Sequence, residues 1–425
     1  MAGWAGEDGE DGAQTDFCVV GAGPAGLTVT LLLLRSGARV TLVERSASQT
    51  RAYRGEILQP GGLRILDALG VLGPARAGGC HELDGFQLLE GGRVVLDSDY
   101  RRLPAPWNHL LSIPQEQVLG ELLARCRRYR GFTLVDGSRV TRLHRRAGRV
   151  SAVVAAGRGG QRRITAHCFV AADGRYSKTR SLAGIAAGRD DVFEHDVLWF
   201  KVPAHGRLPR RVRIERAGGN PVLTYPSGAG HVQIGWLLPH RTYGALAARG
   251  VEHVKDLICA AVPQYADEVR RGVRALTDLT LLDVFASCAP QWAQDGLLLI
   301  GDSAHTHSPV GAQGINLALQ DAVAAHPVLM ASLRRQDATA RFLQRYTGPR
   351  RRDIRRVMRI QRAQSSLMLS TGRLTGTVRP ALAGLVSRTP LYRQILRQIA
   401  FGNRQIRISS QLFTDTYESV EQECV

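Results

Sequence analysis

The chain has 425 residues, of which 44% are hydrophobic and 22% charged, as is typical of globular proteins rather than disordered or fibrous ones. This length predicts two or more structural units, because single cores stop growing well below it. The seven cysteines form no CxxC pair, which argues against a disulfide framework or a zinc ribbon. No apolar run is long enough for a membrane-spanning helix, and the acidic, glycine-rich N-terminus is unlike a signal peptide, so a cytoplasmic protein is expected.

The formal net charge is +19, and most of the excess lies near the C-terminus. Between Arg334 and Ser410 there are 18 arginines and only two acidic residues. Such a segment could contact an acidic surface, and the amphipathic stretch 382–408 suggests weak peripheral contact with an anionic membrane. Nucleic acid is not expected as a partner, because no zinc finger or RNA-binding signature occurs. The arginine run that begins at Arg350 is expected to be a solvated helix face.

The N-terminal part begins with a predicted flexible tail over 1–15 and one βαβ unit. An apolar strand over 16–20 leads into a glycine-rich turn, an apolar helix over 27–34 and a β-branched strand over 39–44. Further helices are expected over 61–72 and 114–127, and further strands over 150–155 and 164–172.

The predicted secondary structure changes twice in the rest of the chain, from α/β to antiparallel β and then to mainly helical. Residues 83–104 are predicted to form a hairpin, and the short β-branched and aromatic runs between 190 and 280 an antiparallel sheet. A buried strand over 296–300 then precedes a helix that begins at Gly314 and is expected to end before Pro327. Basic helices are predicted over 335–412.

The glycine-rich turn is the first motif that indicates a function. In Gly21-x-Gly23-x-x-Gly26, the first glycine permits a tight turn, the second leaves room for a phosphate, and the third lets helix and strand pack closely. A pyrophosphate can then reach the free N–H groups of the helix N-terminus. Glu44 ends the second strand, where a carboxylate can accept hydrogen bonds from ribose hydroxyls. The pattern predicts a dinucleotide site.

Two further motifs follow predicted strands. Asp173-Gly174 precedes Arg175 and Arg180, and Gly301-Asp302 precedes a Pro- and Gly-rich loop. A strand delivers Asp302 to a turn, where its carboxylate could accept from a polyol. The loop ends at the helix that begins at Gly314, whose N-terminus suits negative charge on a ring or an oxyanion.

In this order the three motifs resemble those of the single-component, p-hydroxybenzoate-hydroxylase-like flavoprotein aromatic monooxygenases, over roughly residues 16 to 330. Ubiquinone-pathway hydroxylases and natural-product oxygenases share them. The resemblance implies a monooxygenase with bound FAD that uses NAD(P)H and O₂. Through a C4a-hydroperoxyflavin it would hydroxylate or epoxidise an aromatic or polyunsaturated small molecule in secondary metabolism. No metal is expected, since no ligand spacing for one occurs.

The same resemblance implies an α/β fold with a Rossmann-like FAD-binding domain, an inserted antiparallel β-sheet substrate domain and a C-terminal helical segment. The FAD-binding domain would comprise 16–82, 105–190 and 281–334. The substrate domain would comprise 83–104 and 191–280, and the basic helical region 335–425.

Cofactor-binding residues follow from the resemblance, motif by motif. The turn would cradle the pyrophosphate, Arg45 would lie beside the adenine and Arg54 near the mobile flavin. The full set is Gly21, Gly23, Pro24, Ala25, Gly26, Glu44, Arg45, Arg54, Gln115, Val140, Asp173, Asp302, Pro309, Gly311, Gly314, Ile315 and Asn316. Backbone N–H groups of Ile315 and Asn316 would meet the N1–C2=O edge of the flavin.

Residues of the substrate pocket are harder to assign. Pro309 is expected to form a pocket wall, and Tyr225, Trp199 and Trp236 lie on the inserted sheet that covers the flavin in this family. No catalytic residue is assigned. His305 and His307 follow a strand in a buried loop, where structural hydrogen bonding is the favoured interpretation.

Other functions remain open on this scaffold. A flavin-dependent reductase or oxidase of an isoprenoid or natural-product substrate would need no oxygen insertion, and a non-catalytic flavin-binding protein would bind FAD without consuming NAD(P)H. A halogenase is disfavoured, because its WxWxIP segment is absent and only three lysines occur. Substrate identity, the choice between NADH and NADPH, and the oligomeric state are left open.

Overall fold

A computed structural model describes residues 13–47, 55–369 and 389–414, except 187, 192, 205, 207, 217, 218, 229 and 310. Its first strand, β1 (Ala13–Val20), begins three residues earlier than the sequence suggested. Residues 13–15 are therefore not part of a flexible tail. They pair with Ile164, Thr165 and Ala166 of a neighbouring strand, which supplies backbone partners that the sequence alone could not reveal.

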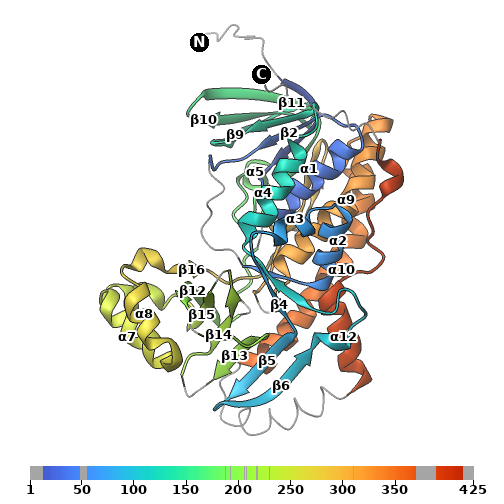
Figure 1. Cartoon of the computed structure of the whole chain (residues 1–425). Helices are drawn as coiled ribbons and strands as arrows, with labels where there is room; N and C mark the ends of the chain where they lie inside the picture. The colour runs from blue at the N-terminus through green and yellow to red at the C-terminus, as the bar shows by residue number, and fades with distance from the viewer. Residues whose placement is uncertain are drawn as a thin grey trace, which may run out of the picture.

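The upper part of Figure 1 is built on a largely parallel sheet. The parallel strands lie in the order β8-β2-β1-β11-β19, and β18 is an antiparallel edge. Two further antiparallel strands, β9 and β10, extend from β11. The strand bounds are β2 Val40–Val43, β8 Phe132–Val135, β9 Ser138–Arg146, β10 Arg149–Gly157, β11 Gly160–Ala171, β18 Ala293–Gln294 and β19 Leu297–Leu299.

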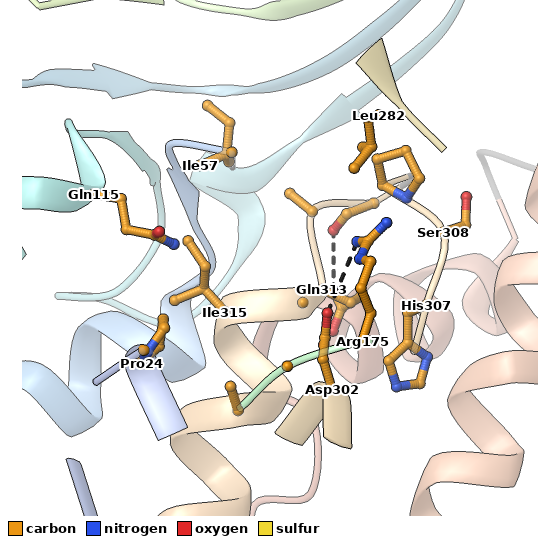
Figure 2. A pocket seen from close by; sticks show the side chains of 18 of the residues that line it. Pro24, Ile57, Gln115, Arg175, Leu282, Asp302, His307, Ser308, Gln313 and Ile315 are labelled. Atoms are coloured by element: carbon orange, nitrogen blue, oxygen red, sulfur yellow. Dashed lines mark hydrogen bonds and ion pairs between the residues drawn. The ribbon is translucent and has the colours of Figure 1, made fainter. Parts of the chain in front are cut away.

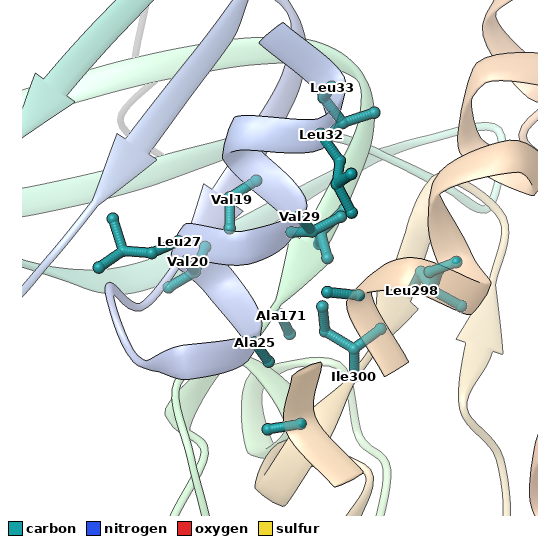
Figure 3. Close-up of a cluster of buried hydrophobic side chains, with 14 of the residues drawn as sticks. Val19, Val20, Ala25, Leu27, Val29, Leu32, Leu33, Ala171, Leu298 and Ile300 are labelled. Carbon is teal, nitrogen blue, oxygen red and sulfur yellow. The ribbon is translucent and has the colours of Figure 1, made fainter. Parts of the chain in front are cut away.

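Helices cover this sheet and bury its apolar residues. Helix α1 (Pro24–Arg35) packs against α4 (Gln115–Cys126) and α9 (Gly314–Arg335). Figure 3 shows Val19 of β1, Leu32 of α1 and Leu298 of β19 in one cluster. Nearly all of α1 is buried, because both the sheet and other helices contact it; this explains its continuous apolar sequence.

A second sheet forms the lower part of the molecule in Figure 1. Its order is β16-β12-β15-β14-β13-β5-β6, so the hairpin before residue 100 joins the strands after residue 190. The join is the parallel pairing of β5 with β13. The bounds are β5 Gly85–Glu90, β6 Arg93–Asp99, β12 His195–Pro203, β13 Val212–Arg216, β14 Val222–Ser227, β15 His231–Pro239 and β16 Thr280–Leu282.

Smaller elements connect and cover the two sheets. A three-stranded sheet β3-β7-β4 is built from segments on either side of the β5-β6 hairpin in sequence. The helices α7 and α8 pack on one face of the second sheet. The remaining bounds are β3 Ile57–Leu58, β4 His81–Leu83, β7 Leu110–Ser112, β17 Ser287–Cys288, β20 His305–Thr306, α2 Pro60–Ala68, α3 Leu72–Arg76, α5 Lys178–Leu182, α6 Tyr243–Ala247, α7 Val251–Ala261 and α8 Ala266–Gly272.

Helix α9 does not end before Pro327, as was expected; it continues through the proline to Arg335. Proline removes one backbone hydrogen bond and crowds the preceding turn. The residues after it, including Leu329 and Met330, are buried in the main core, and this packing outweighs the local cost. The prediction failed because burial after the proline is a tertiary property.

The C-terminal helices α10 (Ala340–Leu369) and α12 (Pro390–Phe401) pack against the rest of the chain. Arg350 is not on a solvated face: its side chain is 2% exposed and pairs with Asp321 of α9. The prediction was wrong for Arg350 because sequence does not show which helix face meets a buried carboxylate, whereas Arg352, Arg355 and Arg356 of the same run are exposed as expected. Among the described residues, no helix is long and apolar enough to cross a membrane.

Candidate active site

A cavity of about 1510 Å³ lies between the two sheets. Gly21 and Pro24 line one end of it, and Trp199 and Tyr225 line the other. Figure 2 shows Pro24, Gln115 and Ile315 on one side of this space and Asp302 and His307 on another. The helices α10 and α12 supply part of the wall through Ile360 and Leu396 and their neighbours. The cavity therefore brings together segments from most of the chain.

The turn after β1 can only be built from glycine at two positions. Gly21 has φ +103°, and a Cβ there would lie 2.5 Å from the carbonyl oxygen of Ala172. A Cβ on Gly26 would lie 1.8 Å from the carbonyl oxygen of Gly21. Gly26 does not line the cavity; it lets α1 approach the turn, whereas Gly21 and Gly23 face the open space.

The carboxylate of Glu44 holds the same turn. It accepts hydrogen bonds from the backbone N–H of Ala22 at 2.7 Å and of Ser46 at 3.0 Å. Glu44 and Arg45 both line the cavity. The end of β2 is thus fixed against the end of β1, which places the carboxylate where a bound nucleotide would pass. Its contact with a ribose stays a prediction.

Asp173 and Asp302 also line the cavity, from the ends of β11 and β19. The oxygens of Asp173 accept from the hydroxyl of Ser177 and from the N–H of Thr179 at 2.9 Å, so the carboxylate fixes the start of α5. One oxygen of Asp302 lies 3.8 Å from the guanidinium of Arg175. Asp302 has more freedom to meet a ligand than Asp173 has.

The two arginines after Asp173 have different positions. Arg175 lines the cavity and donates to the carbonyl of Asp283 at 2.8 Å. Arg180 is turned away and donates to the carbonyl of Ser303 at 2.8 Å, which ties α5 to the turn after β19. Of the two, only Arg175 can contact a ligand in this cavity.

The loop before α9 supplies Pro309, Gly311, Gly314 and Ile315 to the cavity wall. Gln313 fixes this loop, since its Nε2 donates to the carbonyls of Gly311 and of Ile399 in α12. The N–H groups of the first helical turn have no partner within the helix and carry the positive end of its dipole. The side chain of Asn316 is fully buried behind them and does not line the cavity.

A buried ionic cluster lies directly behind this loop. Facing ring nitrogens of His305 and His307 are 2.7 Å apart, and the other nitrogen of His305 is 2.7 Å from Asp321. Arg350 donates to the same carboxylate at 2.6 Å. Asp321 also accepts from the N–H of Gly301 at 2.7 Å. The histidines thus make the structural hydrogen bonds that were favoured from the sequence, although His307 also lines the cavity.

Charges within the cluster shift the ionisation of its members. Burial acts to raise the pKa of Asp321, but His305 and Arg350 together outweigh it and hold the pKa well below the usual range. Burial, assisted by electrostatic interaction with His305, lowers the pKa of His307 well below its ordinary value. At neutral pH the cluster therefore contains an ionised Asp321 and a neutral His307.

Two of the three aromatic residues expected in the substrate pocket line the cavity. Trp199 and Tyr225 line the cavity with ring centroids 6.3 Å apart. Trp236 does not: it packs with residues of α7 and α8 on the other face of the sheet. Its neighbour Leu237 faces the cavity instead, because successive strand residues point to opposite faces. The expectation that Trp236 faces the pocket was therefore wrong, because Trp236 lies on the opposite face of the strand from Leu237.

Three further residues were predicted to bind FAD; two of them line the cavity, and the third lies outside the described residues. Gln115 at the start of α4 and Val140 of β9 both contact the open space. Arg54 is not among the residues that the structure describes. Their predicted contacts with FAD stay predictions.

Several residues of the cavity wall were not predicted from the sequence. Glu56, Tyr100 and Tyr392 line the cavity, as do Arg356 and Arg359 of the basic helix α10. Glu56 is two residues from a position that the family resemblance did indicate, which is the nearest signal for it. The others come from segments with no motif, so only the tertiary arrangement identifies them.

Comparisons with known proteins agree with this geometry. The FAD binding domain family matches residues 14–361. The chain is also 58% identical to 6-methylpretetramide 4-monooxygenase of Streptomyces rimosus over 405 residues, covering 95% of this chain and 96% of that one. The chain belongs to the FAD-binding monooxygenase family. This membership disfavours the two alternatives that the sequence left open, a reductase and a non-catalytic flavin-binding protein.

Solved structures show the same fold for this FAD-dependent monooxygenase. p-Nitrophenol 4-monooxygenase from Pseudomonas putida superimposes with a TM-score of 0.77 at 18% identity, covering 92% of this chain and 99% of that one. Anhydrotetracycline hydroxylase from S. rimosus does so with a TM-score of 0.73 at 23% identity, covering 91% of this chain and 76% of that one. At these identities the likeness concerns the fold alone.

The residues present fit FAD. The turn at Gly21 and Gly23 leaves the start of α1 open to a pyrophosphate, and a Cβ at Gly21 would clash with the backbone of Ala172 and displace the turn. In the same part of the cavity, the first turn of α9 offers N–H groups at Gly314 and Ile315. One continuous cavity joins these two helix N-termini, as an extended dinucleotide requires.

Proposed function

We propose that this monooxygenase uses NAD(P)H and O₂ to hydroxylate a polycyclic aromatic polyketide of the 6-methylpretetramide type, at the position that its S. rimosus relative modifies. The observation that carries the proposal is the 58% identity along nearly the whole of both chains. A protoasukamycin 4-monooxygenase and an aklavinone 12-hydroxylase, both from streptomycetes, are more distant relatives of the chain and support a substrate from secondary metabolism.

The cavity supports a large substrate. A site for one drug-sized ligand usually measures roughly 300–1,000 Å³. The cavity of about 1510 Å³ leaves room for a polycyclic molecule beside FAD. Its far wall is aromatic and aliphatic, with Phe86, Trp199, Tyr225 and Leu237 from four strands of the second sheet. Flat apolar surfaces of this kind suit fused rings.

Residues of this chain would bind, orient and shield the reactants. FAD supplies the redox chemistry that activates oxygen. The positive end of α9 would favour negative charge at the flavin edge beside Gly314 and Ile315. The aromatic wall would hold the substrate and exclude water, which a reactive oxygen donor requires. Reduction would come from NAD(P)H bound transiently, since the sequence has one glycine-rich dinucleotide motif.

The test is turnover of 6-methylpretetramide by the purified, FAD-loaded protein. We expect NAD(P)H oxidation to accelerate with the compound, and the product to gain one oxygen atom that derives from ¹⁸O₂. Substrate-stimulated NAD(P)H oxidation without oxygen in the product, or turnover that persists without O₂, would contradict the proposal and favour a reductase. A cytoplasmic site of action, which fits the supply of NAD(P)H, is part of the same proposal.

A further inference from the structure

A polar cluster interrupts the apolar wall of the cavity. Glu56, just before β3, lines the cavity, and 6% of its side chain is exposed. One carboxylate oxygen lies 2.5 Å from the ammonium of Lys201 on β12, and the other accepts from the hydroxyl of Ser227 on β14. Its backbone carbonyl accepts from the N–H of Ile113 at 2.9 Å, which fixes the main chain there.

Strand alternation places this cluster next to the aromatic wall. On β12, Trp199 lines the cavity and Lys201 is the next residue on the same face. On β14, Tyr225 lines the cavity and Ser227 is the next residue on that face. The carboxylate of Glu56 therefore lies where the row of aromatic rings ends.

A second acceptor belongs to the same row. Gln233 of β15 is paired across the sheet with both Lys201 and Tyr225, so its side chain is on the face that carries them. It is fully buried and donates through Nε2 to the carbonyl of Phe200, whereas its Oε1 has no hydrogen-bond partner. A buried acceptor without a partner is costly, and since Gln233 does not itself line the cavity, it indicates a water molecule beside the cluster.

The hydrogen-bond inventory of the cluster defines what can bind. A carboxylate has roughly four acceptor sites, of which Lys201 and Ser227 use two. Lys201 balances the charge, so a second positive charge is not required. The cluster therefore offers acceptors to a neutral donor such as a phenolic hydroxyl or an amide N–H. If Glu56 served only to hold β3 against the second sheet, its carboxylate would not need to reach the cavity surface.

We propose that Glu56, held by Lys201 and Ser227, is the substrate-anchoring residue, which accepts a hydrogen bond from a hydroxyl or amide N–H substituent of a polycyclic aromatic substrate and so fixes its orientation. This inference rests on the proposed function and adds the group that selects among polycyclic compounds. Glu56 has no part in the oxygen chemistry itself; it decides which ring position faces the flavin.

The experiment measures ligand binding to the oxidised holoenzyme, without reductant. The probes are 2,6-dihydroxyanthraquinone and its dimethyl ether, with unsubstituted anthraquinone as a shape control, at a pH where the phenols are protonated. We expect the wild type to bind the dihydroxy compound at least about tenfold more tightly than either of the others, because a hydrogen bond to a charged group gives that discrimination.

The variant E56Q keeps the shape and lowers the charge. We expect the preference for the dihydroxy compound to fall to about threefold or less, since a neutral acceptor binds a donor about half as strongly. The matched control is E82Q. Glu82 is a carboxylate paired with Arg76, and it does not line the cavity. E82Q should keep the wild-type preference and the wild-type affinities.

A preference that E56Q leaves unchanged would overturn the proposal, because the discrimination would then be steric. Equal loss of all three ligands in E56Q would overturn it too, since that is the result of a merely structural tie. Binding of none of the probes to the wild type would also overturn it. The readout is affinity in the absence of turnover, so failure of the hydroxylation assay would leave these results unchanged.

Discussion

The two ends of the cavity are built in different ways. At the nucleotide end, contacts depend on backbone: the turn at Gly21, the start of α1 and the start of α9 present N–H groups. At the substrate end, contacts depend on side chains from two sheets and two C-terminal helices. Backbone sites need particular conformations, which constrain residue type strongly, whereas a side-chain wall can change residue by residue. The first end can serve many enzymes, and the second selects a substrate.

The largest effect is expected from crowding the nucleotide end. In G26A the new Cβ would meet the carbonyl oxygen of Gly21 at 1.8 Å, so the turn must move away from α1. Overpacking of this kind typically costs about 1–3 kcal/mol, and here it also displaces the N–H groups that face the pyrophosphate. We expect G26A to be purified with less than about a tenth of the wild-type flavin content, measured by visible absorbance.

The control for this variant is G73A, since a Cβ at that position of α3 would meet no atom of another segment within 4 Å. It should keep full flavin content. Normal flavin content in G26A would show that the third glycine of the motif is not needed for the close approach of α1.

The next largest effect concerns the ionic cluster behind the loop that joins the two ends. In D321N, Arg350 loses its buried counter-charge and Gly301 loses its acceptor. Breaking a buried pair by removing one partner costs about 3–5 kcal/mol. We expect the free energy of unfolding in urea to fall by that amount.

The matched control, D256N, removes an exposed carboxylate that pairs with Arg270. Exposed pairs contribute about 0–1 kcal/mol, so D256N should unfold nearly like the wild type. A loss in D321N no greater than in D256N would mean that the cluster does not stabilise the loop before α9.

A pH effect of similar size is expected where α9 meets α1. His326 is fully buried, with its Nε2 2.8 Å from the hydroxyl of Ser36. Burial, with a smaller contribution from Arg334, lowers the pKa of His326 to about 4. The unfolded chain binds this proton near pH 6.5, whereas the folded chain does not until about pH 4. Stability should therefore fall by up to about 3 kcal/mol as pH is lowered through that window, and level off below it.

Urea unfolding at several values between about pH 7 and about pH 4.5 measures this dependence. The variant H326Q lacks the titrating group, so its stability should depend less on pH in that window. Equal pH dependence in the two proteins would show that His326 is protonated in the folded state or makes no contribution.

The smallest effect distinguishes the two faces of the second sheet. Trp199 lines the cavity, whereas Trp236 packs against α7 and α8. W199F should weaken binding of a polycyclic ligand several-fold with flavin content unchanged. W236F should leave ligand affinity unchanged and lower the free energy of unfolding by about 1 kcal/mol. Ligand titration and urea unfolding of both variants give the comparison, and similar ligand affinities in the two would contradict the assigned faces.

The nucleotide end was predictable from sequence because its constraints are local. Gly21, Gly26 and Glu44 act within one βαβ unit, and their spacing is a property of that unit. The substrate end was predictable only as a sheet. Trp199 and Trp236 look alike in sequence, and only the register of β12 and β15 places them on opposite faces. The role proposed for Glu56 depends on its contacts with Lys201 and Ser227, which are more than 140 residues away in sequence.

The C-terminal helices show the same limit. Arg350 is one of many arginines in sequence, and its burial depends on Asp321 of another helix. Pro327 has the local signature of a helix end, yet burial of the following turn keeps α9 continuous. Local rules failed where long-range packing or a buried charge decided the outcome. The roles of the cofactor-binding residues and the domain boundaries stay predictions from the sequence.

The most direct measurement is a crystal structure of the protein saturated with FAD. We predict that the pyrophosphate lies against the N–H groups of the turn that begins at Gly21. The pyrimidine edge of the flavin should lie against those of Gly314 and Ile315, with the aromatic wall left open for substrate. A flavin bound outside this cavity, or one whose ring occupies the space beside Trp199 and Glu56 instead of reaching α9, would contradict the proposed division of the cavity.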